Sequence, residues 1–127
     1  DIVDVTTGSH VRVSGPHNVR ASYRFDPRNG AFIWNNDNQH AYWGAGASAD
    51  LVFALFSGHT DSERQHASLV HIFSWRGRFI AEVALDRGTI VLSVSPSGDR
   101  LYGMVEEPWP AIGVWPVPHE LKQRWRR

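Results

Sequence analysis

The apolar residues of this chain occur in short runs, most of which alternate with polar residues and end at a turn residue. Runs of four to eight residues rich in Val, Ile and aromatic side chains are typical of β-strands. The prolines and glycines lie mostly between the runs, where they interrupt regular structure. This pattern predicts an all-β chain. The expected strands lie within residues 11–13, 51–56, 69–73, 79–85, 90–94 and 111–115, and a short helix is expected after Pro118, near residues 119–125.

Three glycine-containing turns predict that consecutive strands pair as antiparallel hairpins. Asn29-Gly30 is a strong signal for a two-residue hairpin turn, because a type I′ turn needs positive φ at both central positions. Weaker signals of the same kind are Trp75-Arg76-Gly77 and Ser97-Gly98-Asp99. Hairpins joined in succession build an antiparallel meander rather than a sandwich with long crossovers.

One short motif occurs twice in the chain. Residues 26–33 read DPRNGAFI and residues 95–103 read SPSGDRLYG, each with a small polar residue, a proline, a turn and an apolar pair. The two copies lie too far apart for one four-stranded unit of roughly 40 to 50 residues, and they suit two successive units if one is abbreviated. Repeated four-stranded meanders are typical of β-propellers.

The sequence therefore predicts a single all-β domain over residues 1–127, a partial β-propeller of two to three four-stranded antiparallel blades. We expect an abbreviated blade and its leading strands over about 1–40, and a complete blade over 41–88. A partial last blade follows over 89–118, and a basic tail over 119–127. A blade without a neighbour exposes strand edges and an apolar face, which proteins usually cover.

The later part of the chain resembles the TolB-like six-bladed β-propellers found among secreted proteins of Gram-negative bacteria. The resemblance rests on LVFALFSG (51–58), SLVHIFSWRGRFIAEVALDRG (68–88) and IVLSVSPSGDRLYGMVEEPWPAIGVWPV (90–117), in this order. It implies the carboxy-terminal blades of such a ring and an extracytoplasmic location, periplasmic or secreted. A full six-bladed ring needs roughly 300 residues or more, so the chain supplies only part of one.

Charge and composition exclude several classes of protein. Thirteen basic residues balance thirteen acidic ones, whereas a nucleic-acid binder normally carries a basic excess on one face. The chain has no cysteine, which excludes disulfides and cysteine-based metal sites. No run approaches the roughly 18 apolar residues that span a membrane.

A polar loop over residues 58–66 carries several nitrogen and oxygen donors. Their spacings match no metal signature, and a loop of this kind is better suited to partner contact than to catalysis. We therefore expect a solvated loop that contacts a partner, with no metal and no cofactor. The residues expected to make this contact are His59, Asp61, Glu63 and His66.

His71 lies inside an expected strand, where alternation places it on the same side as Leu69 and Phe73. We expect a half-buried histidine that is hydrogen-bonded to backbone, rather than a catalytic base. The remaining histidines stand alone in turns or near chain ends and are expected at the surface: His10, His17, His40 and His119.

The sequence contains no recognisable catalytic constellation. It has no G-x-S-x-G motif, and Ser57 with its neighbours at one corner does not provide the geometry of a catalytic triad. Glu106 and Glu107 are adjacent, so their side chains point to opposite sides of an extended chain instead of facing each other across a sugar. The sequence therefore predicts a protein that is not an enzyme.

The tryptophans divide into two groups by local sequence. Trp34, Trp75 and Trp115 occupy strand-like positions, where we expect them to pack between blades. Trp43 and Trp109 lie beside Gly or Pro, in expected loops, and an aromatic face there suits stacking on a sugar or a peptide.

The carboxy-terminal residues 122–127 read KQRWRR and contain Trp125 and Arg126. Basic residues around an aromatic anchor suit peripheral contact with an anionic membrane surface or an acidic partner. The alternative is a solvated chain end.

These observations predict a non-enzymatic propeller-type module that docks on a protein partner, or on further propeller blades, through loops and open blade edges. One alternative is a carbohydrate-binding module that uses the loop tryptophans. The other alternative is part of a propeller enzyme, a hydrolase or lyase whose catalytic residues lie in blades outside this chain.

Overall fold

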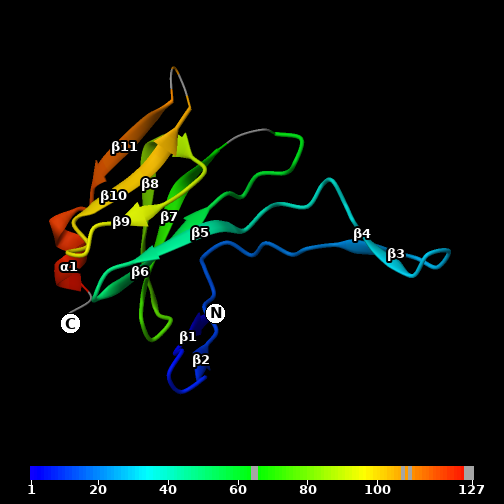
Figure 1. Ribbon diagram of the computed structural model, residues 1–127, viewed down its shortest axis with the longest axis horizontal. Coiled ribbons are helices and arrows are strands. Elements are labelled where there is room, and N and C mark those ends of the chain that lie inside the picture. The colour runs from blue at the N-terminus through cyan, green and yellow to red at the C-terminus, as the bar shows by residue number, and fades with distance from the viewer. Residues whose placement is uncertain (64–65, 107, 109, 125–127) are drawn as a thin grey trace.

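A computed structural model describes residues 1–63, 66–106, 108 and 110–124 of the chain, with the backbone alone for 122–124 (Figure 1). The described residues confirm the all-β prediction, because they form antiparallel strands and one short helix. The elements in chain order are β1 (Ile2–Val3), β2 (His10–Val11), β3 (Tyr23–Asp26), β4 (Ala31–Trp34), β5 (Tyr42–Ala47), β6 (Leu51–Phe56), β7 (Ala67–Ser74), β8 (Phe79–Thr89), β9 (Ser93–Val94), β10 (Arg100–Val105), β11 (Ala111–Pro116) and α1 (His119–Arg124).

The largest sheet has the strand order β5-β6-β7-β8, so each strand pairs with its neighbour in sequence. Its central strands β6 and β7 are buried along most of their length. One face of this sheet, which we call the core face, carries Phe53 opposite Ile72 and Leu55 opposite Val70. All four side chains have no exposed surface. Burial of these aliphatic and aromatic side chains provides the main stabilisation of the fold.

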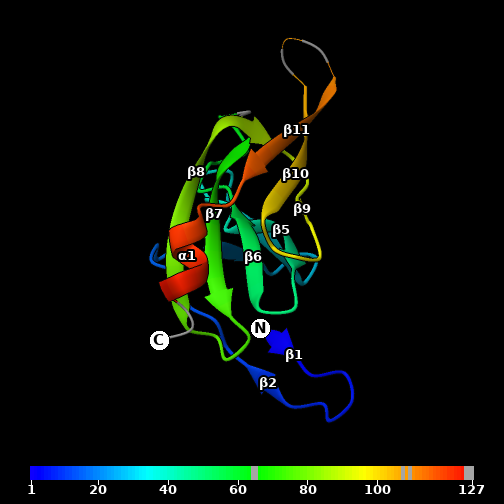
Figure 2. The same ribbon diagram turned by 90° about the vertical axis from the view of Figure 1, so that its left-hand side faces the viewer.

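A second sheet, with the order β9-β10-β11, lies against the core face (Figures 1 and 2). Leu101 of β10 and Val117 are buried in the same cluster as Leu51 and Phe53. Helix α1 begins directly after Pro118, as the sequence predicts, and places Leu121 against the cluster. This helix has 6 residues, and no helix in the described part of the chain is long and apolar enough to cross a membrane.

The amino-terminal third is built differently. Strands β1 and β2 form one two-stranded ribbon, and β3 and β4 form another, which projects away from the body of the molecule (Figure 1). The sheets formed by the described residues have two to four strands, and none of them closes on itself.

The turn of the β3–β4 ribbon differs from the prediction. Because Asp26 pairs with Ala31, the loop between the strands has four residues rather than the two expected from Asn29-Gly30. The Asp26 carboxylate accepts a hydrogen bond from the Arg28 backbone N–H, and the Asn29 side chain accepts one from the Ala31 N–H. These side-chain contacts stabilise a longer turn than the dipeptide alone indicates.

Candidate functional site

The face of the β5–β8 sheet that points away from the core face carries a buried polar cluster centred on His71. His71 lies on β7 with no exposed surface, directly opposite Glu82 of β8 and Ala54 of β6. The small Ala54 side chain leaves room beside His71, and the ring of Phe56 stacks there with a centroid distance of 4.7 Å. Strand alternation placed His71 on this side correctly, opposite in direction to Val70 and Ile72.

Both nitrogens of the His71 ring have side-chain partners. Its Nδ1 lies 2.7 Å from the Tyr42 hydroxyl, and its Nε2 lies 2.9 Å from Glu82 Oε2. The same Glu82 oxygen lies 2.8 Å from Nε2 of His17. His71 and His17 therefore meet at one carboxylate oxygen, although they come from distant parts of the sequence.

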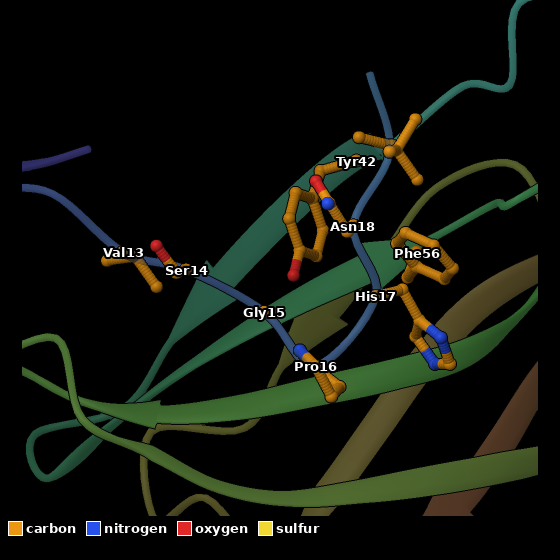
Figure 3. A pocket seen from close by; sticks show the side chains of 10 residues that line it. Val13, Ser14, Gly15, Pro16, His17, Asn18, Tyr42 and Phe56 are labelled. Atoms are coloured by element: carbon orange, nitrogen blue, oxygen red, sulfur yellow. The ribbon is translucent and has the colours of Figure 1, made fainter.

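His17 belongs to the segment 13–19, which crosses this sheet face (Figure 3). The His17 ring stacks on Phe56 with a centroid distance of 4.9 Å and on His71 with a distance of 5.4 Å. Gly15 allows the close approach, because a Cβ at this position would collide with the Tyr42 hydroxyl and lie 3.1 Å from His71 Nδ1. The segment thus covers the Tyr42–His71 hydrogen bond with backbone rather than with a side chain.

The electrostatics of the cluster agree with this hydrogen-bond pattern. Burial lowers the pKa of His71, and the neighbouring Glu82 carboxylate partly opposes that shift. The hydrogen bond from His17 contributes most to lowering the pKa of Glu82, so this side chain is a carboxylate at neutral pH. Burial, and then the Glu82 charge, raises the pKa of Tyr42, which keeps its hydroxyl protonated. Both hydrogen bonds of His71 are satisfied if its ring is neutral, donates from Nε2 to Glu82 and accepts a hydrogen bond at Nδ1 from the Tyr42 hydroxyl.

Two predictions about histidines are corrected by this geometry. His71 is fully buried rather than half-buried, and its partners are side chains rather than backbone groups. His17 is exposed, as expected, but it does not stand alone. The sequence signal that points to this site is Gly15-Pro16-His17, in which a glycine that permits close approach is followed two residues later by a polar ring.

A pocket of about 380 Å³ lies beside the cluster. The segment 13–19 forms one wall, and Tyr42 and Phe56 form the other (Figure 3). His17 and Tyr42 belong to both the pocket lining and the cluster, so the pocket adjoins the cluster.

Among the described residues, the loop predicted to contact a partner forms one histidine–carboxylate pair within itself and two with residues elsewhere in the chain. His59 lies 3.6 Å from Glu63, whose carboxylate accepts a hydrogen bond from the Thr60 backbone N–H. Hydrogen bonds from Thr60 lower the pKa of Glu63. Asp61 pairs with His40 at 2.5 Å, while His66 pairs with Glu106 at 3.4 Å, at the end of β10. His66 therefore pairs with a different part of the chain from His59, Asp61 and Glu63.

A continuous row of aromatic rings runs along one face of the β3–β4 ribbon and reaches β5. Tyr23 is opposite Trp34, and Phe25 is opposite Phe32, with ring centroids 5.8 Å and 5.4 Å apart. His40 continues the row between Trp34 and Trp43, at 6.3 Å and 6.0 Å. We call this row the aromatic strip; its members are Tyr23, Phe25, Phe32, Trp34, His40 and Trp43.

The expectation that Trp43 lies in a loop is wrong. Trp43 is part of β5, where it is the extra residue of a β-bulge between the pairs Tyr42–Phe56 and Gly44–Leu55. A bulge re-aims the side chain at that position, and 39% of Trp43 is exposed. Because His40 contacts both Trp43 and Asp61, the structure places two of the predicted binding residues on one surface.

The other predicted aromatic and basic sites give a mixed result. Trp115 packs against the core cluster, as expected, and its indole N–H donates to Asp86. Trp34 and Trp75 are exposed instead of packed between sheets. Three predicted binding residues lie outside the described residues: Trp109, Trp125 and Arg126.

The second sheet has an apolar surface on the side opposite the core, which we call the outer face. Tyr102 and Met104 of β10 lie opposite Val114 and Ile112 of β11, respectively, so all four share this face. Ile112 is 69% exposed and Val114 is 52% exposed. In the described part of the chain, β11 pairs only with β10, so its second edge is open.

No family model, curated protein or solved structure matches the chain.

Proposed function

We propose that this chain is a non-enzymatic binding module, a part of a β-propeller that docks on a protein surface through the outer face and the open edge of β11. The observation that carries the proposal is an exposed apolar sheet face next to a strand edge, that of β11, which has no pairing partner among the described residues. Ile112 and Val114 are the most exposed members of that face.

The arrangement of the two stacked sheets supports the propeller part of the proposal. In a propeller, antiparallel meanders of about four strands stack face to face around an axis. Here a four-stranded meander, β5–β8, is followed by a three-stranded one, β9–β11, and they share one core. The outer face lies where the next blade of such a ring would pack. The resemblance to TolB-like propellers and the extracytoplasmic location belong to the same proposal.

The chemistry of the outer face favours a protein as the occupant. Its exposed side chains are aliphatic or methionine, which pack well against another apolar sheet but offer little to a sugar. The free edge of β11 adds backbone N–H and C=O groups, which a strand from another protein can pair with. We therefore expect the partner to present a β-sheet with an apolar face, as a propeller blade does.

The experiment places a photo-crosslinking amino acid at position 112 of the chain, in its native source, and a matched one at position 5. Val5 is 94% exposed and lies outside the outer face, so it controls for general surface contact. We expect a specific crosslink only from position 112. The purified partner should then bind Ile112→Arg at least about tenfold more weakly than the unmodified chain, because the residues that dominate an interface cost about 2 kcal/mol or more when they are replaced, and about 1.4 kcal/mol is a factor of ten.

Val5→Arg adds the same charge and should leave the affinity unchanged. Equal affinity of both variants, or equal crosslinking from both positions, would show that the outer face is not the docking surface.

The aromatic strip favours carbohydrate binding as a second candidate function. Trp34 and Trp43 are 40% and 39% exposed, and both contact His40. Exposed aromatic faces in a row suit stacking against successive sugar rings. Glycan-array binding that disappears in Trp43→Ala and persists in Trp75→Ala, a tryptophan outside the strip, would support this candidate. Absence of glycan binding by the unmodified chain would contradict this candidate function.

A further inference from the structure

We propose that His17, His71 and Glu82 form a Zn²⁺ site that fastens the segment 13–19 to the β5–β8 sheet. The site has two imidazoles and one carboxylate, each from a different part of the chain. Their ligating atoms all lie within 4.8 Å of one another, and no other group of three or more such side chains in the described residues meets this criterion.

The donor set matches the preferences of zinc. Zn²⁺ binds imidazole nitrogen and carboxylate oxygen at about 2.0 to 2.2 Å, and two histidines with one glutamate leave a fourth position for water. Glu82 Oε2 already lies 2.8 Å and 2.9 Å from the two Nε2 atoms. Two ligand atoms bound to the same Zn²⁺ lie slightly further apart than 2.8 Å or 2.9 Å. The two histidine rings therefore need only small displacements to make room for the ion.

The neutral ring of His71 can carry its proton on either Nδ1 or Nε2 without losing the hydrogen bond to Tyr42. Metal binding requires a free Nε2, so the ring proton must then reside on Nδ1. The Tyr42 hydroxyl lies 2.7 Å from Nδ1 and can donate to it or accept from it. A second partner that orients a ligating histidine is a usual feature of metal sites, and Tyr42 provides it here.

The site combines one buried ligand with two partly exposed ones. His71 has a side chain with no exposed surface, while the side chains of His17 and Glu82 are 45% and 36% exposed. An ion can therefore enter from solvent and reach a ring anchored in the sheet. This burial also distinguishes the cluster from the exposed pairs His40–Asp61 and His59–Glu63, each of which has only two ligating groups.

The structural consequence concerns the segment 13–19, which forms no helix or strand. Its described contacts with the sheet include the His17–Glu82 hydrogen bond and the stacking of His17 on Phe56. A metal ion at this point would add bonds from the segment to two different strands, β7 and β8. Zn²⁺ should therefore raise the Tm of the chain by binding the folded state.

The test is a calorimetric titration of the chelator-treated chain with ZnCl₂, together with thermal unfolding with and without Zn²⁺. We expect one Zn²⁺ per chain. His17→Ala and Glu82→Gln should weaken binding at least about 100-fold and abolish the increase in Tm, since each removes a direct ligand. Tyr42→Phe should weaken binding about 10- to 100-fold, as loss of an orienting partner does.

His40→Ala is the matched control, because it removes a histidine from a different histidine–carboxylate pair, His40–Asp61. This variant should bind Zn²⁺ like the unmodified chain. His17 is exposed, so His17→Ala should fold, and its circular dichroism spectrum establishes this. No binding by the unmodified chain, or equal binding by the His17→Ala and His40→Ala variants, would overturn the proposal.

Discussion

At the residue scale, the absence of a side chain at Gly103 lets the two sheets approach closely. Gly103 of β10 is buried, and a Cβ there would lie 2.9 Å from both Thr89 Cβ and the Val91 carbonyl oxygen. The Thr89 hydroxyl lies 2.9 Å from the carbonyl oxygens of Val91 and Met104, so these groups are already in hydrogen-bonding contact. A larger residue at position 103 must displace this contact.

We therefore expect Gly103→Ala to lower the free energy of unfolding by about 1 to 3 kcal/mol, the usual cost of overpacking. Gly44→Ala is the matched control, because Gly44 also lies in a strand but a Cβ there meets nothing within 4 Å. That variant should be neutral or more stable by about 0.5 kcal/mol, since alanine loses less backbone entropy on folding. Urea unfolding of the two variants measures the difference in free energy of unfolding. An equal change in both variants would contradict the close contact between Gly103 and Thr89.

At the scale of elements, the β3–β4 ribbon differs most from the rest of the molecule. It pairs with no third strand in the described residues, and it exposes 56% of Phe25 and 74% of Phe32. An isolated two-stranded hairpin is marginally stable in water. Its contacts include those between its own aromatic side chains, and His40 links Trp34 of the ribbon to Trp43 of β5.

We expect the backbone amides of β3 and β4 to exchange with solvent far faster than those of β6 and β7. Opening of the ribbon exposes few apolar contacts, whereas opening of β6 or β7 requires disruption of the core. Hydrogen exchange followed by mass spectrometry of peptides covering 23–34 and 51–56 measures both rates. Similar protection of the two peptides would mean that the ribbon is stabilised by contacts beyond its own pairing.

At the scale of the whole molecule, one core joins both sheets and the helix. Phe53 has no exposed surface and lies in this cluster with Leu101 of the second sheet. The two sheets should therefore unfold together, because neither can bury its apolar face alone.

Phe53→Ala should lower the free energy of unfolding by about 3 to 5 kcal/mol, the usual cost of truncating a buried phenylalanine. Phe32→Ala makes the same truncation at an exposed site and should cost under about 1.5 kcal/mol, the value of an aromatic pair. Chemical denaturation followed by tryptophan fluorescence and by circular dichroism measures both, and the two probes should give the same transition. Separate transitions would show that the sheets unfold independently.

The positions of most strands follow from the sequence because they depend on near neighbours. Alternation within 69–73 placed Val70 and Ile72 on one face and His71 on the other, as the structure shows. The helix after Pro118 and the glycine turns at Gly77 and Gly98 are equally local, since positive φ and proline sterics act over a few residues. The β3–β4 turn was predicted less well because the side chains of Asp26 and Asn29 accept hydrogen bonds from backbone N–H groups, which stabilise a longer turn.

The sequence by itself therefore determined the all-β class, the approximate strand positions and the face on which His71 lies. Only the tertiary structure decided that the segment 13–19 crosses that face, that His17 reaches Glu82, and that the rings of the aromatic strip form one row. Periodicity and turn chemistry are set by neighbouring residues, whereas contacts between distant segments depend on the free energy of packing the whole chain. That free energy is a small difference between large terms, so it cannot be calculated from the order of neighbouring residues alone.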